Sequence, residues 1–203
     1  ANRLVRAHIR ILAALVLGHL LNAVVVAVAF YGRVPSISLV LGCMAVAIVG
    51  AHRYWLGQSE RKRFSRIGSQ AMVWQLEANT LALALIASGS LVALMPYGGA
   101  AHQLMLAVVG MSLIGAAGYT MRTLPRAAIG YIAIISVGLM AALLGTGTVV
   151  AIATCILILA TSLLLCRMAL TAYSLFVVRI VRERERNSSI ETVKMLLNDF
   201  EDQ

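Results

Sequence analysis

Six apolar stretches, separated by short polar segments, run through almost the whole chain. A helix needs roughly 20 predominantly apolar residues to cross the hydrocarbon core of a bilayer, and these stretches have about that length. Of the 203 residues, 61% are hydrophobic and only 12% are charged, which is not typical of a soluble domain. The sequence therefore predicts an all-α membrane protein with six transmembrane helices, at residues 11–31, 36–52, 72–95, 102–121, 127–144 and from 148 onward.

The 17 Lys and Arg residues are distributed asymmetrically over the connecting segments. Three precede the first stretch, five precede the third, two precede the fifth and six follow residue 166, whereas the other turns carry only Arg33. Basic segments remain on the cytoplasmic side of a membrane. We therefore expect both termini in the cytoplasm, in a bacterial inner (plasma) membrane. The same rule and the attraction of anionic headgroups account for the pI near 10.2, so we expect no nucleic-acid partner.

Short turns alternate with the basic loops along the chain. The turns at residues 32–35, 96–99 and 145–147 all contain glycine, and they leave no room for an extracytoplasmic domain. We expect three antiparallel hairpins, which join the first helix to the second, the third to the fourth and the fifth to the sixth. Anything sensed from outside must then enter the bundle or arrive through the lipid.

Small residues within the stretches are candidates for close contacts between helices, because they let two backbones approach. Such spacings also occur by chance in Ala-rich spans, so each candidate contact is a hypothesis. The candidates are Ala14 with Gly18, Gly110 with Ser112 and Gly115, and Gly138 with Ala142.

Two polar residues, His19 and Asn22, lie one turn apart in the first expected helix and share a face. Polar groups inside the membrane are costly and are candidates for a functional site. His19 is the best candidate in the chain for a ligand to a metal or haem iron, or for a protonation switch. The alternative is a hydrogen bond between helices that orients the first helix. The sequence identifies no cofactor.

Glu77 is the one acidic residue within reach of the hydrocarbon region. It is a candidate proton or cation site. The alternative is an ion pair with Arg53, Arg122 or Arg126 at the same depth, which we favour because an unpaired buried carboxylate carries a large desolvation cost.

The sequence contains no glycine-rich phosphate loop, no Cys/His cluster at metal-binding spacing and no nucleophile–base pair, so we assign no catalytic residue. A small transporter or channel that uses Glu77 and His19 as coupling groups is one alternative function, and a haem- or metal-binding membrane module is another. The outer halves of the six spans are almost purely apolar, which does not favour a transport pathway.

The sixth helix is expected to continue beyond the membrane, because residues 167–187 contain no Gly or Pro. We divide the chain into a transmembrane domain at 1–170 and a cytoplasmic signalling-helix linker at 171–203. Residues 187–189 are either a flexible joint or the cap of a second helix. Apolar residues then recur with the spacing of a coiled-coil seam, which predicts a homodimer; they are Ile190, Val193, Leu197 and Phe200. The alternative is an amphipathic helix that lies on the membrane.

Residues 182–187 (RERERN) and 191–201 (ETVKMLLNDFE) are similar to the linker of proteobacterial membrane-bound cyclic-di-GMP signalling proteins. In that family a multi-helix membrane region precedes PAS, GGDEF and EAL domains. The resemblance implies a membrane sensor or anchor region whose cytosolic output domain, which makes or degrades cyclic-di-GMP, follows Gln203 in a longer protein. None of the PAS, GGDEF or EAL motifs occurs in these residues. A sensor histidine kinase is an alternative class of protein that carries this kind of linker.

Overall fold

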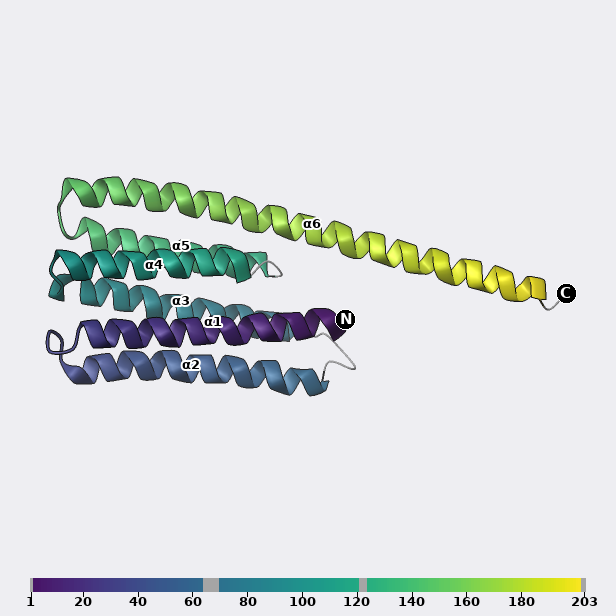
Figure 1. Ribbon diagram of the computed structural model, residues 1–203, viewed down its shortest axis with the longest axis horizontal. Coiled ribbons are helices and arrows are strands. Elements are labelled where there is room, and N and C mark those ends of the chain that lie inside the picture. The colour runs from purple at the N-terminus through teal and green to yellow at the C-terminus, as the bar shows by residue number, and fades with distance from the viewer. Residues whose placement is uncertain (1, 64–69, 121–123, 202–203) are drawn as a thin grey trace.

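The computed structural model of the protein describes residues 2–63, 70–120 and 124–201. Side chains are described at residues 16–52, 54–55, 74–75, 77–118, 124–175, 177–179, 181–182 and 185–186. All regular elements in this part of the chain are helices, which confirms the all-α class (Figure 1). They are α1 (Asn2–Ala29), α2 (Ser36–Arg63), α3 (Gln70–Leu94), the short 3-10 helix η1 (Met95–Tyr97), α4 (Ala100–Thr120), α5 (Pro125–Leu144) and α6 (Val149–Glu201).

Glycine and proline lie at the helix boundaries, close to the expected turns. Gly32 and Gly147 have φ angles of 78° and 67°, a left-handed conformation that other residues adopt only with strain. Pro96 lies in η1 directly after α3, and Pro125 is the first residue of α5, where its missing N–H leaves no hydrogen bond unmade. The turns therefore follow from the local sequence.

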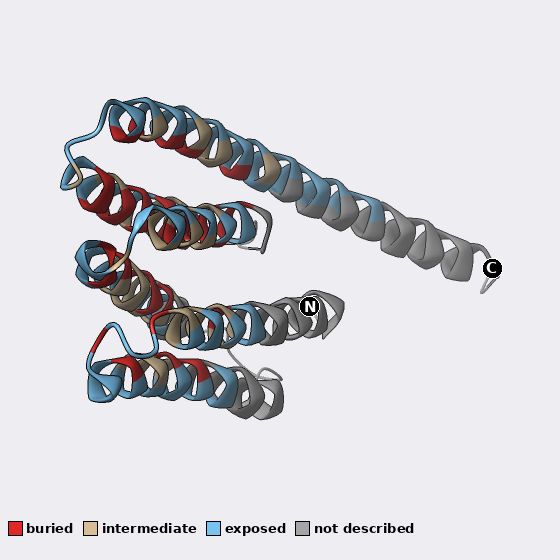
Figure 2. Ribbon diagram, turned by 60° about the vertical axis from the view of Figure 1, so that its left-hand side comes forward, coloured by how far each residue is buried: buried red, intermediate tan, exposed pale blue. Residues whose placement is uncertain are grey.

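Helix α5 lies at the centre of the bundle, with α3, α4 and α6 packed against it. More than half of its apolar span is buried by other parts of the protein, compared with 22% of the span in α6. The pair formed by α1 and α2 joins this group through contacts of α2 with α3 and of α1 with α4. Buried residues accordingly lie on the inward faces of the helices (Figure 2).

The packing differs from three side-by-side hairpins. Helix α1 packs on α2 and α5 packs on α6, but α3 and α4 make few contacts with each other. Each of these two helices packs instead on α5, whose inward face carries large buried side chains such as Tyr131, Ile135 and Leu139. A short turn brings the ends of two helices together, but it does not determine whether the two helices pack against each other along their length.

Among the described residues, four helical segments are long and apolar enough to cross a membrane, namely Glu77–Tyr97, Ala100–Gly118, Pro125–Leu144 and Val149–Arg179. The apolar segments in the described parts of α1 and α2 are shorter, at Val16–Ala29 and Ser36–His52. The part of the chain whose side chains are described thus contains four candidate spans.

Helix α6 is unbroken over 53 residues and extends well beyond the other helices (Figure 1). It passes through residues 187–189 without interruption, so the expected joint or second cap at this segment is wrong. The sequence there lacks Gly and Pro, and helix propensity of the flanking residues is sufficient to continue the helix. The expected seam residues Ile190, Val193, Leu197 and Phe200 lie in this helix, but their side chains are outside the described residues.

Candidate functional site

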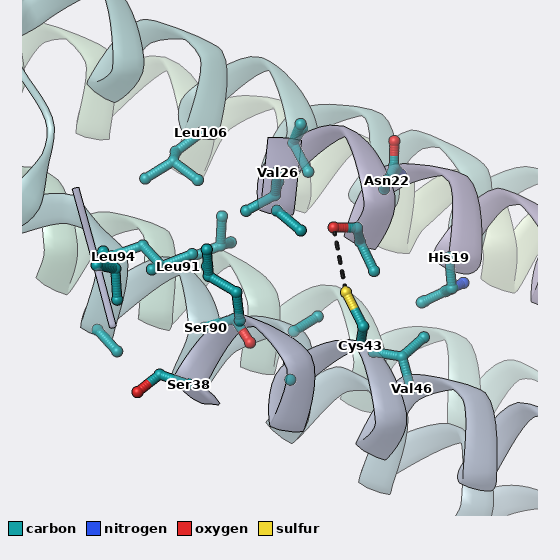
Figure 3. A pocket seen from close by; sticks show the side chains of 18 of the residues that line it. His19, Asn22, Val26, Ser38, Cys43, Val46, Ser90, Leu91, Leu94 and Leu106 are labelled. Carbon is teal, nitrogen blue, oxygen red and sulfur yellow. Dashed lines mark hydrogen bonds between the residues drawn. The ribbon is translucent and has the colours of Figure 1, made fainter. Parts of the chain in front are cut away.

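A cavity of about 320 Å3 lies between α1, α2, α3 and α4 (Figure 3). Its wall is mostly apolar, with Val26 from α1, Val46 from α2, Leu91 and Leu94 from α3, and Leu106 from α4. A cavity of this size is at the lower end of the range found for small-molecule sites, about 300 to 1,000 Å3. The four helices therefore form a candidate site for a small, largely apolar ligand.

His19 and Asn22, which the sequence singles out together, both line this cavity. They lie at one end of it, whereas Leu94 and Ser38 lie at the other end (Figure 3). Ser38 and Tyr97 are exposed, so the cavity opens beside the α1–α2 turn and η1. Asn22 precedes the end of α1 by seven residues, which places it about 10 Å below the opening.

The imidazole of His19 is held by a hydrogen bond between its Nε2 atom and the hydroxyl oxygen of Tyr131 in α5, at 2.5 Å. The rings meet edge to face with centroids 5.7 Å apart. His19 is 5% exposed and Tyr131 is fully buried. This contact is the interhelical hydrogen bond expected as the alternative role of His19, and it ties α1 to the central helix.

The same contact bears on the metal hypothesis for His19. A metal ion at Nε2 would have to displace the Tyr131 hydroxyl, because one imidazole nitrogen cannot hold both. Among the described residues, no group of three or more His, Cys, Asp or Glu side chains is placed to hold a metal ion. The geometry around His19 therefore supports a structural hydrogen bond better than a metal ligand.

A second buried polar contact joins α5 to α6. The hydroxyl oxygens of Ser136 and Ser162 are 2.6 Å apart, and the two residues are 3% and 6% exposed. Sequence analysis missed Tyr131, Ser136 and Ser162, because single hydroxyl residues are common in membrane helices and carry no periodic signal. Together the two contacts make α5 a polar bridge between α1 and α6.

Two of the expected small-residue contacts are present. A Cβ atom added at Gly138 would lie 1.8 Å from the Ser88 Oγ and 2.9 Å from the Ser88 Cβ, so α3 and α5 approach closely there. A Cβ atom at Gly110 would lie 2.8 Å from a methyl group of Leu139. Both glycines therefore allow neighbouring helices to pack on or around α5.

The other glycine candidates are wrong. A Cβ atom at Gly18 or Gly115 would meet nothing within 4 Å, and both residues are exposed. Ser112 is also exposed, and its hydroxyl donates to the Val109 carbonyl of its own helix at 2.8 Å. The side chain of Ala14 is outside the described residues.

Glu77 lies near the start of α3, is partly buried and does not line the cavity. Within the described part of the chain it forms no ion pair, and the side chain of Arg126 is exposed. The two other expected partners, Arg53 and Arg122, have side chains outside the described residues. The structure thus brings His19 and Asn22 together in one cavity and places Glu77 outside it.

Comparison of the chain with protein-family models, with curated proteins and with solved structures gives no match.

Proposed function

We propose that this chain is a membrane sensor or anchor domain that relays a signal through α6 to a cytosolic output domain. The observation that carries the proposal is the continuity of α6 from the bundle to Glu201. A single helix that packs on α5 inside the bundle and continues far outside it transmits rotation or translation over its whole length. The output favoured by the linker resemblance is cyclic-di-GMP turnover by GGDEF or EAL domains.

In this proposal all six helices cross a bacterial inner membrane, with both termini in the cytoplasm. The apolar segment of α6 spans 31 residues, or about 46 Å, which exceeds the roughly 30 Å core of a bilayer. Its exposed side chains, such as Ile156, Leu163 and Leu164, suit lipid contact. The exposed Arg182 and Arg186 follow, as the positive-inside rule requires of a cytoplasmic extension.

The polar contacts of α5 support a route from the cavity to α6. His19 lines the cavity and bonds to Tyr131 in α5, and Ser136, five residues further along α5, bonds to Ser162 in α6. A ligand that binds one arrangement of α1 to α4 better than another shifts the population of that arrangement. The two contacts would then couple the shift to the position of α6.

A homodimer completes the proposed mechanism. Two copies would pair through the apolar repeat at the end of α6, and a shift of α6 would change the pairing register that the output domains experience. The residues of this proposed seam are Ile190, Val193, Leu197 and Phe200.

A transporter or channel that couples through His19 and Glu77 would need both residues on one pathway. Because Glu77 lies outside the cavity that His19 lines, we do not propose that function.

The relay is tested by replacing Val193 and Leu197 with Asp in the same chain. The matched control replaces Thr192 and Asn198, which lie off the seam, with Asp. We expect the seam variant to lose dimerisation in liposomes, measured by Förster transfer between labelled protomers. When the chain is joined to its proposed output domain, the seam variant should no longer control the rate of cyclic-di-GMP turnover. Unchanged transfer and turnover in the seam variant would contradict the relay.

A further inference from the structure

We propose that the cavity between α1, α2, α3 and α4 binds an uncharged amphiphile, a molecule with an apolar chain that ends in one hydroxyl or carbonyl group. The proposal rests on the sensor function and deepens it, because it names the chemical class of the signal. The cavity, its lining and the hydrogen bonds of its polar residues carry the inference.

The lining excludes a charged ligand. The polar residues in it are His19, Asn22, Ser38, Cys43, Ser90 and Tyr97, and the described lining contains no Lys, Arg, Asp or Glu. A carboxylate or ammonium group brought to the depth of Asn22 would leave water without an opposite charge to pair with, which is strongly unfavourable. The ligand is therefore neutral.

Asn22 defines the polar group that the ligand must carry. Among the other polar residues of the lining, the Cys43 thiol donates to the Ala23 carbonyl at 3.6 Å, the Ser90 hydroxyl donates to the Ile86 carbonyl at 2.8 Å, and His19 bonds to Tyr131. The partly buried carboxamide of Asn22 makes no hydrogen bond with any described residue. An unmade hydrogen bond at membrane depth is costly, and a hydroxyl or carbonyl of a ligand satisfies a carboxamide.

The size of the cavity sets the size of the apolar chain. At about 320 Å3 it is roughly twice the volume of the 150 Å3 engineered cavity that accommodates benzene. Apolar side chains from all four helices, among them Val26, Leu91 and Leu106, line the space between the opening and Asn22 (Figure 3). This space suits an unbranched chain of medium length that enters from the side of Ser38 and Tyr97 with its polar end first.

The position of Asn22 also distinguishes this ligand from a membrane lipid. A phospholipid keeps its headgroup at the interface and inserts an acyl chain with the methyl end deepest. That methyl end would lie against the Asn22 carboxamide and leave it without a hydrogen bond. A soluble amphiphile with its polar end deepest satisfies the carboxamide and the apolar wall together.

Photolabelling in liposomes tests the proposal on the whole chain. The probe is 1-decanol with a diazirine in its chain, and the competitors are 1-decanol, decane and decanoate at equal membrane concentrations. We expect mass spectrometry to place the label on peptides that contain the cavity lining, with competition by 1-decanol and little competition by decane or decanoate.

Two variants with matched controls make the test specific. Asn22→Leu should weaken competition by 1-decanol about 5- to 10-fold, the effect of one lost neutral hydrogen bond, whereas Asn79→Leu in α3, outside the cavity, should not. Gly42 lines the cavity and an added Cβ there meets nothing within 4 Å, so Gly42→Leu should fill it and reduce labelling. Gly89→Leu, at an exposed position with equally open space, should leave labelling unchanged. Circular dichroism of each variant verifies the helical fold.

Competition by decane equal to that by 1-decanol, or label spread evenly over lipid-facing residues, would overturn the proposal, because either result means that the cavity holds only acyl chains. The proposal would also be overturned if 1-decanol competed equally well in the Asn22→Leu and Asn79→Leu variants. These outcomes are independent of the relay. Specific labelling, together with a seam variant that dimerises and signals normally, would support the ligand site and reject the relay. A seam variant that loses dimerisation, without specific labelling of the cavity, would support the relay and reject this ligand.

Discussion

His19 in α1 and Tyr131 in α5 share a buried hydrogen bond although they are 112 residues apart in the sequence. The tautomer of His19 decides which of the two groups donates. The bond connects the helix that lines one side of the cavity with the helix on which α3, α4 and α6 pack. It is therefore a point at which occupancy of the cavity can affect the rest of the bundle.

Tyr131→Phe should destabilise the protein by about 1 to 2 kcal/mol, because it keeps the ring and leaves a buried histidine nitrogen without its partner. Unfolding in mixed micelles with increasing dodecyl sulfate measures the loss. Tyr173→Phe, at an exposed position in α6, is the control and should change stability by much less. Equal stabilities for the two variants would show that the bond contributes nothing.

A double-mutant cycle of Ser136→Ala and Ser162→Ala should give a coupling free energy of about 0.6 kcal/mol, the average for hydrogen bonds between membrane helices. The reason is that the two hydroxyls bond to each other across α5 and α6. Ser112→Ala combined with Ser136→Ala provides the control, since the Ser112 hydroxyl bonds within α4. A coupling near zero in the first cycle would remove this contact from the proposed route.

Gly138→Ala should destabilise the bundle by about 1 to 3 kcal/mol, because the added methyl group overlaps Ser88 and separates α3 from α5. Removing the Ser88 hydroxyl should rescue the variant only in part, because the Ser88 Cβ would still lie 2.9 Å from the new methyl group. Gly115→Ala, where a Cβ meets nothing within 4 Å, should be neutral or slightly stabilising. Similar losses in Gly138→Ala and Gly115→Ala would contradict the close approach.

Six crossings predict that residues 31 and 97 face the same side of the membrane and residue 54 faces the other. Tyr31, Tyr54 and Tyr97 are exposed, so each can be replaced by Cys after the three native cysteines have been changed to Ala. We expect a membrane-impermeant maleimide to label positions 31 and 97 only from outside and position 54 only from the cytoplasm. Labelling of position 31 from the same side as position 54 would mean that α2 does not cross the membrane, and it would contradict the six crossings.

Much of the helix layout was predictable from the sequence, because its determinants are local. Apolar stretches define the helices, and glycine or proline at Gly32, Pro96, Pro125 and Gly147 marks where they begin or end. The continuation of α6 beyond the other helices was likewise predictable from the lack of helix breakers after Arg167. The expected interruption at residues 187–189 was wrong, since weak local capping signals do not stop a helix whose flanks favour continuation. Helices α1 and α2 also extend past the expected spans, since α1 begins at Asn2 and α2 ends at Arg63.

The packing of helices and the site were less predictable, because they depend on contacts between distant parts of the chain. Nothing near His19 indicates that its partner is Tyr131, and nothing near Ser136 indicates Ser162. Helix α3 packs on α5 more than on α4 because the surfaces of α3 and α5 are complementary. Gly138 is part of the complementary surface of α5, but this is evident only from the position of Ser88 against it. His19 and Asn22 were predictable from the sequence, because polar residues stand out in an apolar helix.

Electron–electron double resonance on α6 tests the central claim most directly, that one rigid helix leaves the bundle beside a second copy of itself. Spin labels at the exposed positions Leu163 and Val181, in a chain without native cysteines, should give a narrow distance distribution near 27 Å, about 1.5 Å for each helical residue, when labelled chains are diluted with unlabelled ones. Val181 labelled alone and undiluted should give a second narrow distribution between protomers. A broad distribution within the protomer, or no distance between protomers in the intact protein, would contradict the claim.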